Sequence, residues 1–268
     1  MEQLSLLESL NPDFVSITYG AGGGTRELTL DLVAKLSAYR PVPHLTCVGH
    51  TSREIRGILT RYATEGVTNV LALRGDFPKN HQHSHGDFPQ AADLVRFIRE
   101  FARHRDPRGF GIGVAGFPEG HPGTPNRMLE MDHLKAKIDA GANYICTQLF
   151  FDNHDFHDFR DRCELAGIRV PILAGIMPVT SLSSLKRIAE LAGGARIPAK
   201  LIRALGRAGS NPEAIQQAGT HYAAAQCADL LHHGVAGLHF YTLNQAAATL
   251  RICERIGFSK MPGELTTP

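Results

Sequence analysis

Two opposite charges stand at the end of an apolar run in residues 71–78, LALRGDFP. Arg74 and Asp76 are two residues apart, so on a β-strand their side chains would point to the same side. Two charges in the lower core of a sheet would be costly. The pair is therefore expected either to form an ion pair at the surface or to face a polar ligand at the end of the strand, and these residues alone leave both interpretations open.

Other polar side chains also stand at or just after the ends of apolar runs. His44 and His121 do so, and so does Gln148. A single histidine in such a place is most often a core residue, but two at the same edge of a sheet favour a site. Gln148 taken alone is weak evidence, since an amide can be satisfied in many cores.

Two further motifs each have a plain structural interpretation beside a functional one. GAGGGT (20–25) lacks the last glycine of the dinucleotide-binding G-x-G-x-x-G and the lysine of a P-loop. It is either a flexible turn capped by Thr25 or a backbone that lets a flat ligand approach closely. HQHSH (81–85) has no carboxylate or cysteine at ligand spacing, so we predict a solvated loop there and no metal site.

The elements that must position these residues follow from the apolar patterning. Seven short apolar runs are typical of strands, at 13–20, 42–49, 69–76, 111–119, 144–152, 171–178 and 237–244. Helical spacing of apolar residues fills the stretches between them, at 25–39, 52–66, 90–105, 131–142 and 154–167, and again within 179–236. Alternation of this kind indicates a parallel sheet with helical crossovers.

Polar or glycine residues end nearly every predicted strand, which favours a closed α/β (β/α)8 TIM-type barrel over an open doubly wound sheet. A barrel carries its chemistry on the loops after all of its strands, whereas an open sheet concentrates it at one switch point. Seven strands are readable, and the chain opens on a helix at 2–9 where a barrel would have its first strand. We expect a single barrel domain over residues 1–268, without that first strand.

The composition excludes several classes of protein. The 268 residues are 43% hydrophobic, which is enough to bury a core. The net charge of +2 and the pI near 8.3 are too mild to indicate a nucleic-acid partner. The five cysteines show no C-x-x-C spacing, which suits a reducing compartment. No signal peptide and no apolar run of about 18 residues is found, so no membrane partner is expected. We predict a cytoplasmic protein.

A series of motifs along the chain resembles the methylenetetrahydrofolate reductase family of the bacterial type. The motifs are, in order, NPDFVSITYGAGGGTR, PHLTCVG, LALRGDFP, FPEGHP, LKAKIDAGANYICTQLFFD, GIMPV and HFYTLN. The resemblance implies a (β/α)8 barrel that binds FAD at the carboxyl ends of its strands. It further implies that NAD(P)H reduces the flavin and leaves, and that methylenetetrahydrofolate then takes its place and becomes 5-methyltetrahydrofolate. A homo-oligomer is compatible with this function.

The resemblance also implies roles for individual residues. The positions that match flavin-binding residues of the family are Thr18, Tyr19, Ala21, His44, Arg74, Gly75, Asp76, Ala91, Phe117, His121 and Lys137. The positions that match substrate-binding residues are Gln148, Ser184 and Gln245. Arg74 is expected to neutralise charge on FAD. Asp76, the one catalytic residue assigned, is expected to stabilise the cation formed when the folate ring opens.

This chain departs from the family pattern at several of these positions. Phe117 stands where tyrosine is common, Ser184 replaces a glutamine, and Gln245 replaces the arginine of T-L-N-R. The family's E-F-F-P-P segment, with the first strand and the glutamate that acts as general acid, is not found, so the chain is expected to lack that strand. The alternative function is a flavin-binding protein without folate reductase activity, serving as a partner subunit or an NAD(P)H diaphorase.

Overall fold

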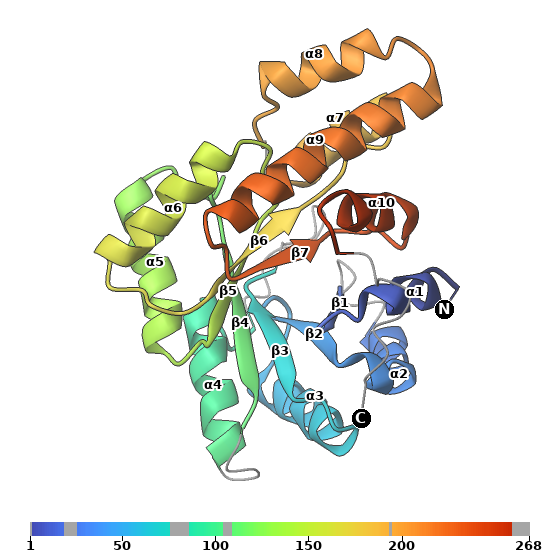
Figure 1. The fold of residues 1–268 in the computed structure, drawn as a ribbon. Helices are drawn as coiled ribbons and strands as arrows, with labels where there is room; N and C mark the ends of the chain where they lie inside the picture. Colours follow the sequence, from blue (N-terminus) through green and yellow to red (C-terminus); the bar gives the residue numbers. More distant parts are fainter. Residues whose placement is uncertain (1, 19–25, 76–85, 104–108, 193–194, 259–268) are drawn as a thin grey trace, which may run out of the picture.

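A computed structural model describes residues 2–18, 26–75, 86–103, 109–192 and 195–258, in which seven parallel strands form one curled sheet (Figure 1). The strands are β1 (Val15–Ile17), β2 (Pro41–Thr46), β3 (Asn69–Leu73), β4 (Gly111–Gly116), β5 (Tyr144–Thr147), β6 (Ile172–Ile176) and β7 (Gly237–Phe240). They are hydrogen-bonded in chain order, each parallel to the next. The seven predicted strands are confirmed, and each is shorter than predicted because its polar end belongs to the following loop.

The two end strands of the sheet, β1 and β7, meet through side chains. Among the described residues they share no ladder of backbone hydrogen bonds. Ser16 Oγ instead lies 2.9 Å from His239 Nε2, and the ring of Phe14 stacks on that of His239 with centroids 5.9 Å apart and planes 14° apart. The sheet is therefore curled far enough for side chains at its two ends to touch. Because no backbone pairing is described between β1 and β7, it is a half-barrel, and it belongs to the predicted α/β barrel class.

Helices precede, separate and follow the strands along the chain, and most of them cover the outer face of the sheet (Figure 1). They are α1 (Glu2–Leu7), α2 (Arg26–Lys35), α3 (Ser52–Thr64), α4 (Ala91–Arg103), α5 (Arg127–Asp139), α6 (Asn153–Leu165), α7 (Leu182–Leu191), α8 (Ala199–Arg207), α9 (Pro212–His232) and α10 (Ala247–Arg255), with the 3₁₀ helices η1 (Glu8–Leu10) and η2 (Ser37–Tyr39). Local side chains set several starts: Thr51 and Glu54 form a reciprocal capping box at α3, and Asn126 caps α5. In the described part of the chain, every helix is too short or too polar to cross a membrane.

Alternate residues of each strand point to opposite faces of the sheet and so build two cores. In β3, Val70 and Ala72 pack with the helices in a large outer core. Leu71 and Leu73 point the other way, into the interior of the half-barrel, where they contact a small apolar cluster with Val42. Because that interior cluster is small, much of the interior face is left to polar side chains.

The long stretch after β6 folds into α7, α8 and α9, as predicted for residues 179–236. The predicted breaks are the starts of α8 and α9, where Pro198 and Asn211 occupy the N-cap positions. These helices enclose an apolar core of their own, made of Leu149, Phe151, Met177, Val179, Ile188, Ala192, Leu201, Leu205 and Ile215. Because its first members follow β5 and β6 directly, this core sits on the carboxyl end of the sheet.

A glycine inside α9 makes a very close backbone contact with the segment after β6. A Cβ atom on Gly219 would lie 1.8 Å from the carbonyl oxygen of Val179. Gly219→Ala is expected to lower the free energy of unfolding by about 3 kcal/mol, because the carbonyl of Val179 cannot yield without moving the backbone of the segment after β6. Denaturant unfolding measures the loss.

The matched control is a second helical glycine. A Cβ atom on Gly206 of α8 would meet nothing within 4 Å. Gly206→Ala is therefore expected to raise stability by about 0.5–1 kcal/mol, since alanine loses less conformational entropy in a helix. Equal effects of the two substitutions would contradict the close approach at Gly219.

Candidate active site

Polar side chains from β1, β2 and β7 meet on the interior face of the sheet. Thr18 Oγ1 lies 3.4 Å from His44 Nδ1, and Ser16 Oγ contacts His239 as described above. The Tyr241 ring meets the His239 ring edge-on, with centroids 5.0 Å apart. Residues from both ends of the chain are thus gathered in one place, because the first and last strands of the sheet touch.

The two histidines of this group are held neutral by their surroundings. Burial lowers the pKa of His44 to about 4, with a smaller contribution from the nearby charge of His239. Burial likewise lowers the pKa of His239 to about 4. His44 Nε2 and His239 Nδ1 are shielded from solvent and have no hydrogen-bond partner among the described residues. Since a buried polar atom without a partner is unfavourable, these nitrogens are suited to receive a polar ligand.

Two tyrosine rings occupy the interior because the strand positions facing them are glycine. A Cβ atom on Gly113 would lie 2.4 Å from Cζ of Tyr144, and one on Gly175 would lie 2.9 Å from Cε2 of Tyr241. Tyr241 Oη donates to the carbonyl of Thr147, 2.9 Å away. Burial raises the pKa of both tyrosines, so they are neutral phenols at physiological pH.

A cavity of about 390 Å³ opens at the carboxyl ends of β4 and β5. Its lining includes Phe117, Glu119, His121, Arg127, Gln148 and Arg196. The rings of Phe117 and His121 meet edge-on with centroids 4.7 Å apart. The volume lies within the range of small-molecule sites, and three of the predicted site residues share it.

Gln148 reaches this cavity from the end of β5. Its backbone N–H donates to the carbonyl of Gly116, 2.7 Å away, which extends the pairing of β4 and β5 beyond the strand. Its side-chain Oε1 accepts from the backbone N–H of Leu149 at 2.9 Å. The amide is therefore held in one orientation at the mouth of the half-barrel.

Glu119 is a carboxyl group of the same cavity to which the sequence analysis gave no role. Burial raises its pKa, against the opposing effect of a hydrogen bond from the backbone of Arg196. That bond joins Glu119 Oε2 to the N–H of Arg196 over 2.7 Å, while Oε1 is shielded and has no partner among the described residues. A cavity-lining carboxyl group whose pKa is raised by burial is a candidate for a role in proton transfer.

The turn after β3 carries Arg74 and Gly75. The Arg74 side chain is exposed, and its carbonyl accepts hydrogen bonds from the backbones of Cys47 and Val48. Gly75 has a φ of +80°, and a Cβ atom on it would lie 3.0 Å from Cβ of Thr46. The exposure of Arg74 excludes a charge buried in the lower core, and it leaves the choice between a surface ion pair and a ligand contact open.

Several predictions fall outside the described residues. Tyr19, Ala21 and Asp76 lie there, as do the GAGGGT motif at 20–25 and the HQHSH motif at 81–85. Their assignments stay predictions.

The other predicted residues are not among those that line the cavity. Lys137 on α5 donates from Nζ to the carbonyl of Ala115 in β4, 2.6 Å away, and burial lowers its pKa to about 8. The Ser184 hydroxyl donates to the carbonyl of Ser181 over 2.7 Å, within the turn that starts α7. Ala91 is the first residue of α4, and Gln245 is exposed in the turn after β7.

The sequence contained a signal for the interior residues that were not assigned. In β7, Leu238 and Phe240 pack against the outer core. Alternation along the strand therefore places His239 and Tyr241 on the interior face. Glu119 carried a weaker signal, its position directly after a predicted strand end within FPEGHP.

A family profile and several known proteins are similar to this chain over most of its length. A profile described as Methylenetetrahydrofolate reductase matches residues 1–257. The 5,10-methylenetetrahydrofolate reductase of Escherichia coli (strain K12) is 37% identical over 254 residues, which cover 94% of this chain and 82% of that protein. Methylenetetrahydrofolate reductase (NADH) 1 of Arabidopsis thaliana is 38% identical over 271 residues, which cover 96% of this chain and 45% of that protein. The chain thus spans less than half of the plant relative.

One solved structure supports the fold. It is an uncharacterized protein from Clostridium thermocellum that binds two copies of 5-methyl-5,6,7,8-tetrahydrofolic acid. The TM-score is 0.50 at 15% sequence identity, and the match covers 94% of this chain and 97% of that chain. At this identity the likeness concerns the architecture alone.

Proposed function

The chain belongs to the methylenetetrahydrofolate reductase family, and we propose on this basis that it reduces 5,10-methylenetetrahydrofolate to 5-methyltetrahydrofolate with NAD(P)H as reductant and FAD as cofactor. The structural observation that supports this proposal most directly is the cavity at the ends of β4 and β5, which Gln148 and Glu119 line together. Barrel enzymes carry their active sites at this end of the strands.

The described residues suit a flavin. The unpartnered ring nitrogens of His44 and His239 can hydrogen-bond to a polar ligand, and Gly75 allows a close approach of the backbone. The residues proposed to hold FAD are Thr18, His44, Arg74, Gly75, Phe117 and His121, and by family resemblance also Tyr19, Ala21, Asp76, Ala91 and Lys137. A bound flavin would supply the hydride chemistry, while the protein supplies binding, orientation and electrostatics.

The chain's own side chains are proposed to orient the substrates and to hold charge and protons. Gln148 binds the nicotinamide and the folate in turn, since both substrates would use the same cavity. Asp76 places a negative charge where a cation forms as the folate ring opens. Glu119, whose pKa is raised by burial and whose Oε1 has no partner among the described residues, is proposed as the group that donates a proton to a basic nitrogen of the substrate.

Replacing Gln148 tests the shared cavity. Gln148→Ala is expected to raise the KM for NAD(P)H and for the folate by about 10-fold each, the effect of losing one hydrogen bond to each substrate. Steady-state kinetics with each substrate varied in turn measures both constants. Gln217→Ala, at an exposed position of α9, is the matched control and should leave both unchanged. A change in one KM alone would contradict a shared role.

Anaerobic half-reactions test the function as a whole. NADH is added to the FAD-loaded protein, and methylenetetrahydrofolate is added after it. Bleaching of the flavin colour followed by its return with the folate would support the proposed reductase. Bleaching without return would favour the alternative, a flavin-binding protein without folate reductase activity. Failure to take up FAD would contradict both functions.

A further inference from the structure

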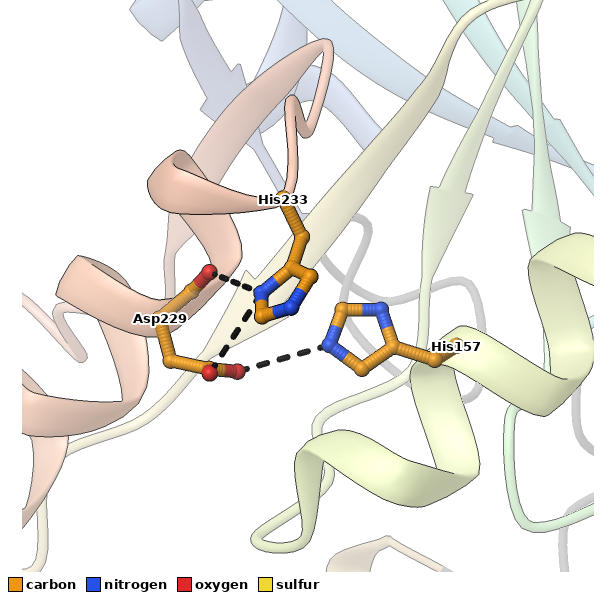
Figure 2. A group of neighbouring side chains, drawn as sticks. All are labelled: His157, Asp229 and His233. Atoms are coloured by element: carbon orange, nitrogen blue, oxygen red, sulfur yellow. Dashed lines mark hydrogen bonds and ion pairs between the residues drawn. The ribbon is translucent and has the colours of Figure 1, made fainter.

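Two histidines and an aspartate converge between α6 and α9 (Figure 2). His157 Nε2 lies 3.4 Å from Asp229 Oδ2, and His233 Nδ1 lies 3.4 Å from Asp229 Oδ1. The two imidazole rings have centroids 4.8 Å apart. Within the described ranges, this is the one place where three ligand atoms from histidine, cysteine or carboxylate side chains lie within 4.8 Å of one another. None of the three residues lines the cavity of the candidate active site.

The spacing distinguishes a hydrogen-bonded cluster from a metal site. Good N–H···O hydrogen bonds are about 2.7–3.2 Å long, so both 3.4 Å contacts are long for that interaction. Ligand atoms about 2.0–2.1 Å from a tetrahedral zinc ion are themselves about 3.3–3.4 Å apart. The distance between His157 Nε2 and Asp229 Oδ2 therefore matches one edge of a zinc coordination tetrahedron, and one ligand atom from each of the three residues lies within 4.8 Å of the others.

The surrounding groups hold the three side chains in a suitable state. Asn153 Nδ2 donates to Asp229 Oδ2 over 2.6 Å, and this hydrogen bond is the main reason that the pKa of Asp229 is lowered, which keeps the carboxylate ionised. His233 Nδ1 lies 2.8 Å from the carbonyl oxygen of Asp229. When that nitrogen carries the proton, the lone pair is on Nε2, which Figure 2 shows turned toward His157. Metal-bound histidines commonly donate their other N–H in this way.

The site is accessible from one side. The exposed fractions of the side chains are 21% for His157, 44% for Asp229 and 48% for His233. An ion can therefore enter from solvent with a bound water, while the helices hold the ligands from behind. Two imidazoles and a carboxylate are the donor set of several zinc sites, and imidazole also suits nickel and copper.

We propose that His157, Asp229 and His233 bind a divalent transition-metal ion, zinc in the first place, with water as the fourth ligand. The ion would join α6 to the end of α9, which already contact each other from Asn153–Gln226 to Arg160–His233. Helix α6 follows β5 and Gln148 along the chain, and α9 leads into β7 with His239. The metal would thus stiffen the support of two strands of the half-barrel.

The test uses the full chain without a polyhistidine tag, stripped of metal by a chelator. Calorimetric titration with Zn²⁺ is expected to show one ion bound per chain, and Co²⁺ should give the visible absorption of a tetrahedral site. Zn²⁺ should also raise the melting temperature by several degrees, as ligands that bind the native state do. His157→Gln and Asp229→Asn should each weaken binding by at least about 100-fold and abolish the thermal shift. Asp229→Asn keeps an oxygen that can accept the hydrogen bond from Asn153. A loss of zinc binding in this variant is therefore not expected to result from unfolding.

Two controls separate this site from other histidines. His154→Gln, at an exposed position on α6 outside the cluster, should leave zinc binding unchanged. Replacing His81, His83 and His85 by glutamine should also leave it unchanged. Loss of the bound ion in that triple variant, with retention in His157→Gln, would place the ion in residues 81–85 and overturn the proposal. Absence of stoichiometric Zn²⁺ binding by the folded parent chain would overturn it as well.

Discussion

Replacing Asp76 with asparagine is expected to slow the reduction of methylenetetrahydrofolate by about 100-fold or more, while reduction of the flavin by NAD(P)H changes little. Asparagine keeps the shape of the side chain and removes its negative charge. The proposed cation exists only in the folate half-reaction, and the loss of one preorganised electrostatic contact costs about 10²–10³ in rate. Stopped-flow absorbance measures the two half-reactions separately.

Another acidic residue, Asp87, supplies the control for Asp76. The Asp87 carboxylate accepts hydrogen bonds from the backbone and hydroxyl of Ser52, each 2.7 Å long. Asp87→Asn makes the same change of charge at a capping position, so the ratio of the two half-reaction rates should stay as it is in the parent protein. Equal slowing of both half-reactions by Asp76→Asn would show that Asp76 builds the site and does not act on the cation.

Acid is expected to destabilise the fold through His44 and His239. Each has a pKa of about 4 in the folded chain, below the ordinary 6.5, because burial disfavours the charged imidazole. The unfolded chain therefore binds more protons between pH 4 and 6.5. The free energy of unfolding therefore keeps its full value above pH 6.5. It falls by about 3 kcal/mol for each histidine as the pH drops toward 4. That loss is a large part of the stability of an ordinary domain.

Denaturant unfolding at a series of pH values from 7 to 4 measures this loss. The variants His44→Gln and His239→Gln remove the titrating groups, so their stability should depend less steeply on pH between 6.5 and 5, where carboxylates contribute little. His154→Gln, at an exposed position, should keep the slope of the parent protein. An unchanged slope in both buried-histidine variants would show that other groups control the acid transition.

The type and order of the elements could be predicted from the sequence because local patterns determine them. A short run of apolar residues indicated β3, and helical spacing of apolar residues indicated α3. The strand ends were predicted too long, since 69–76 contracts to Asn69–Leu73. Backbone pairing stops where a neighbouring strand stops, and no single run of residues contains that information.

The motifs also indicated part of the candidate site. Phe117, His121 and Gln148 follow neighbouring strands β4 and β5, so the chain order of a parallel sheet is sufficient to bring them to one cavity. Lys137 was matched to the flavin site and bonds from α5 to the backbone of β4, and its role toward the flavin stays a prediction. A motif match identifies which residue corresponds to a family position. The direction in which its side chain points depends on the residues packed around it.

The tertiary structure alone decided which distant residues touch and how they titrate. Ser16 and His239 are 223 residues apart and in contact, because the curl of the sheet brings its end strands together. His157 and Asp229 meet across 72 residues because α6 and α9 pack side by side. The raised pKa of Glu119 and the lowered pKa of His44 arise mainly from burial. Burial of a charged group depends on every element packed around it, whereas the local pattern of a sequence reflects only the element to which the group belongs.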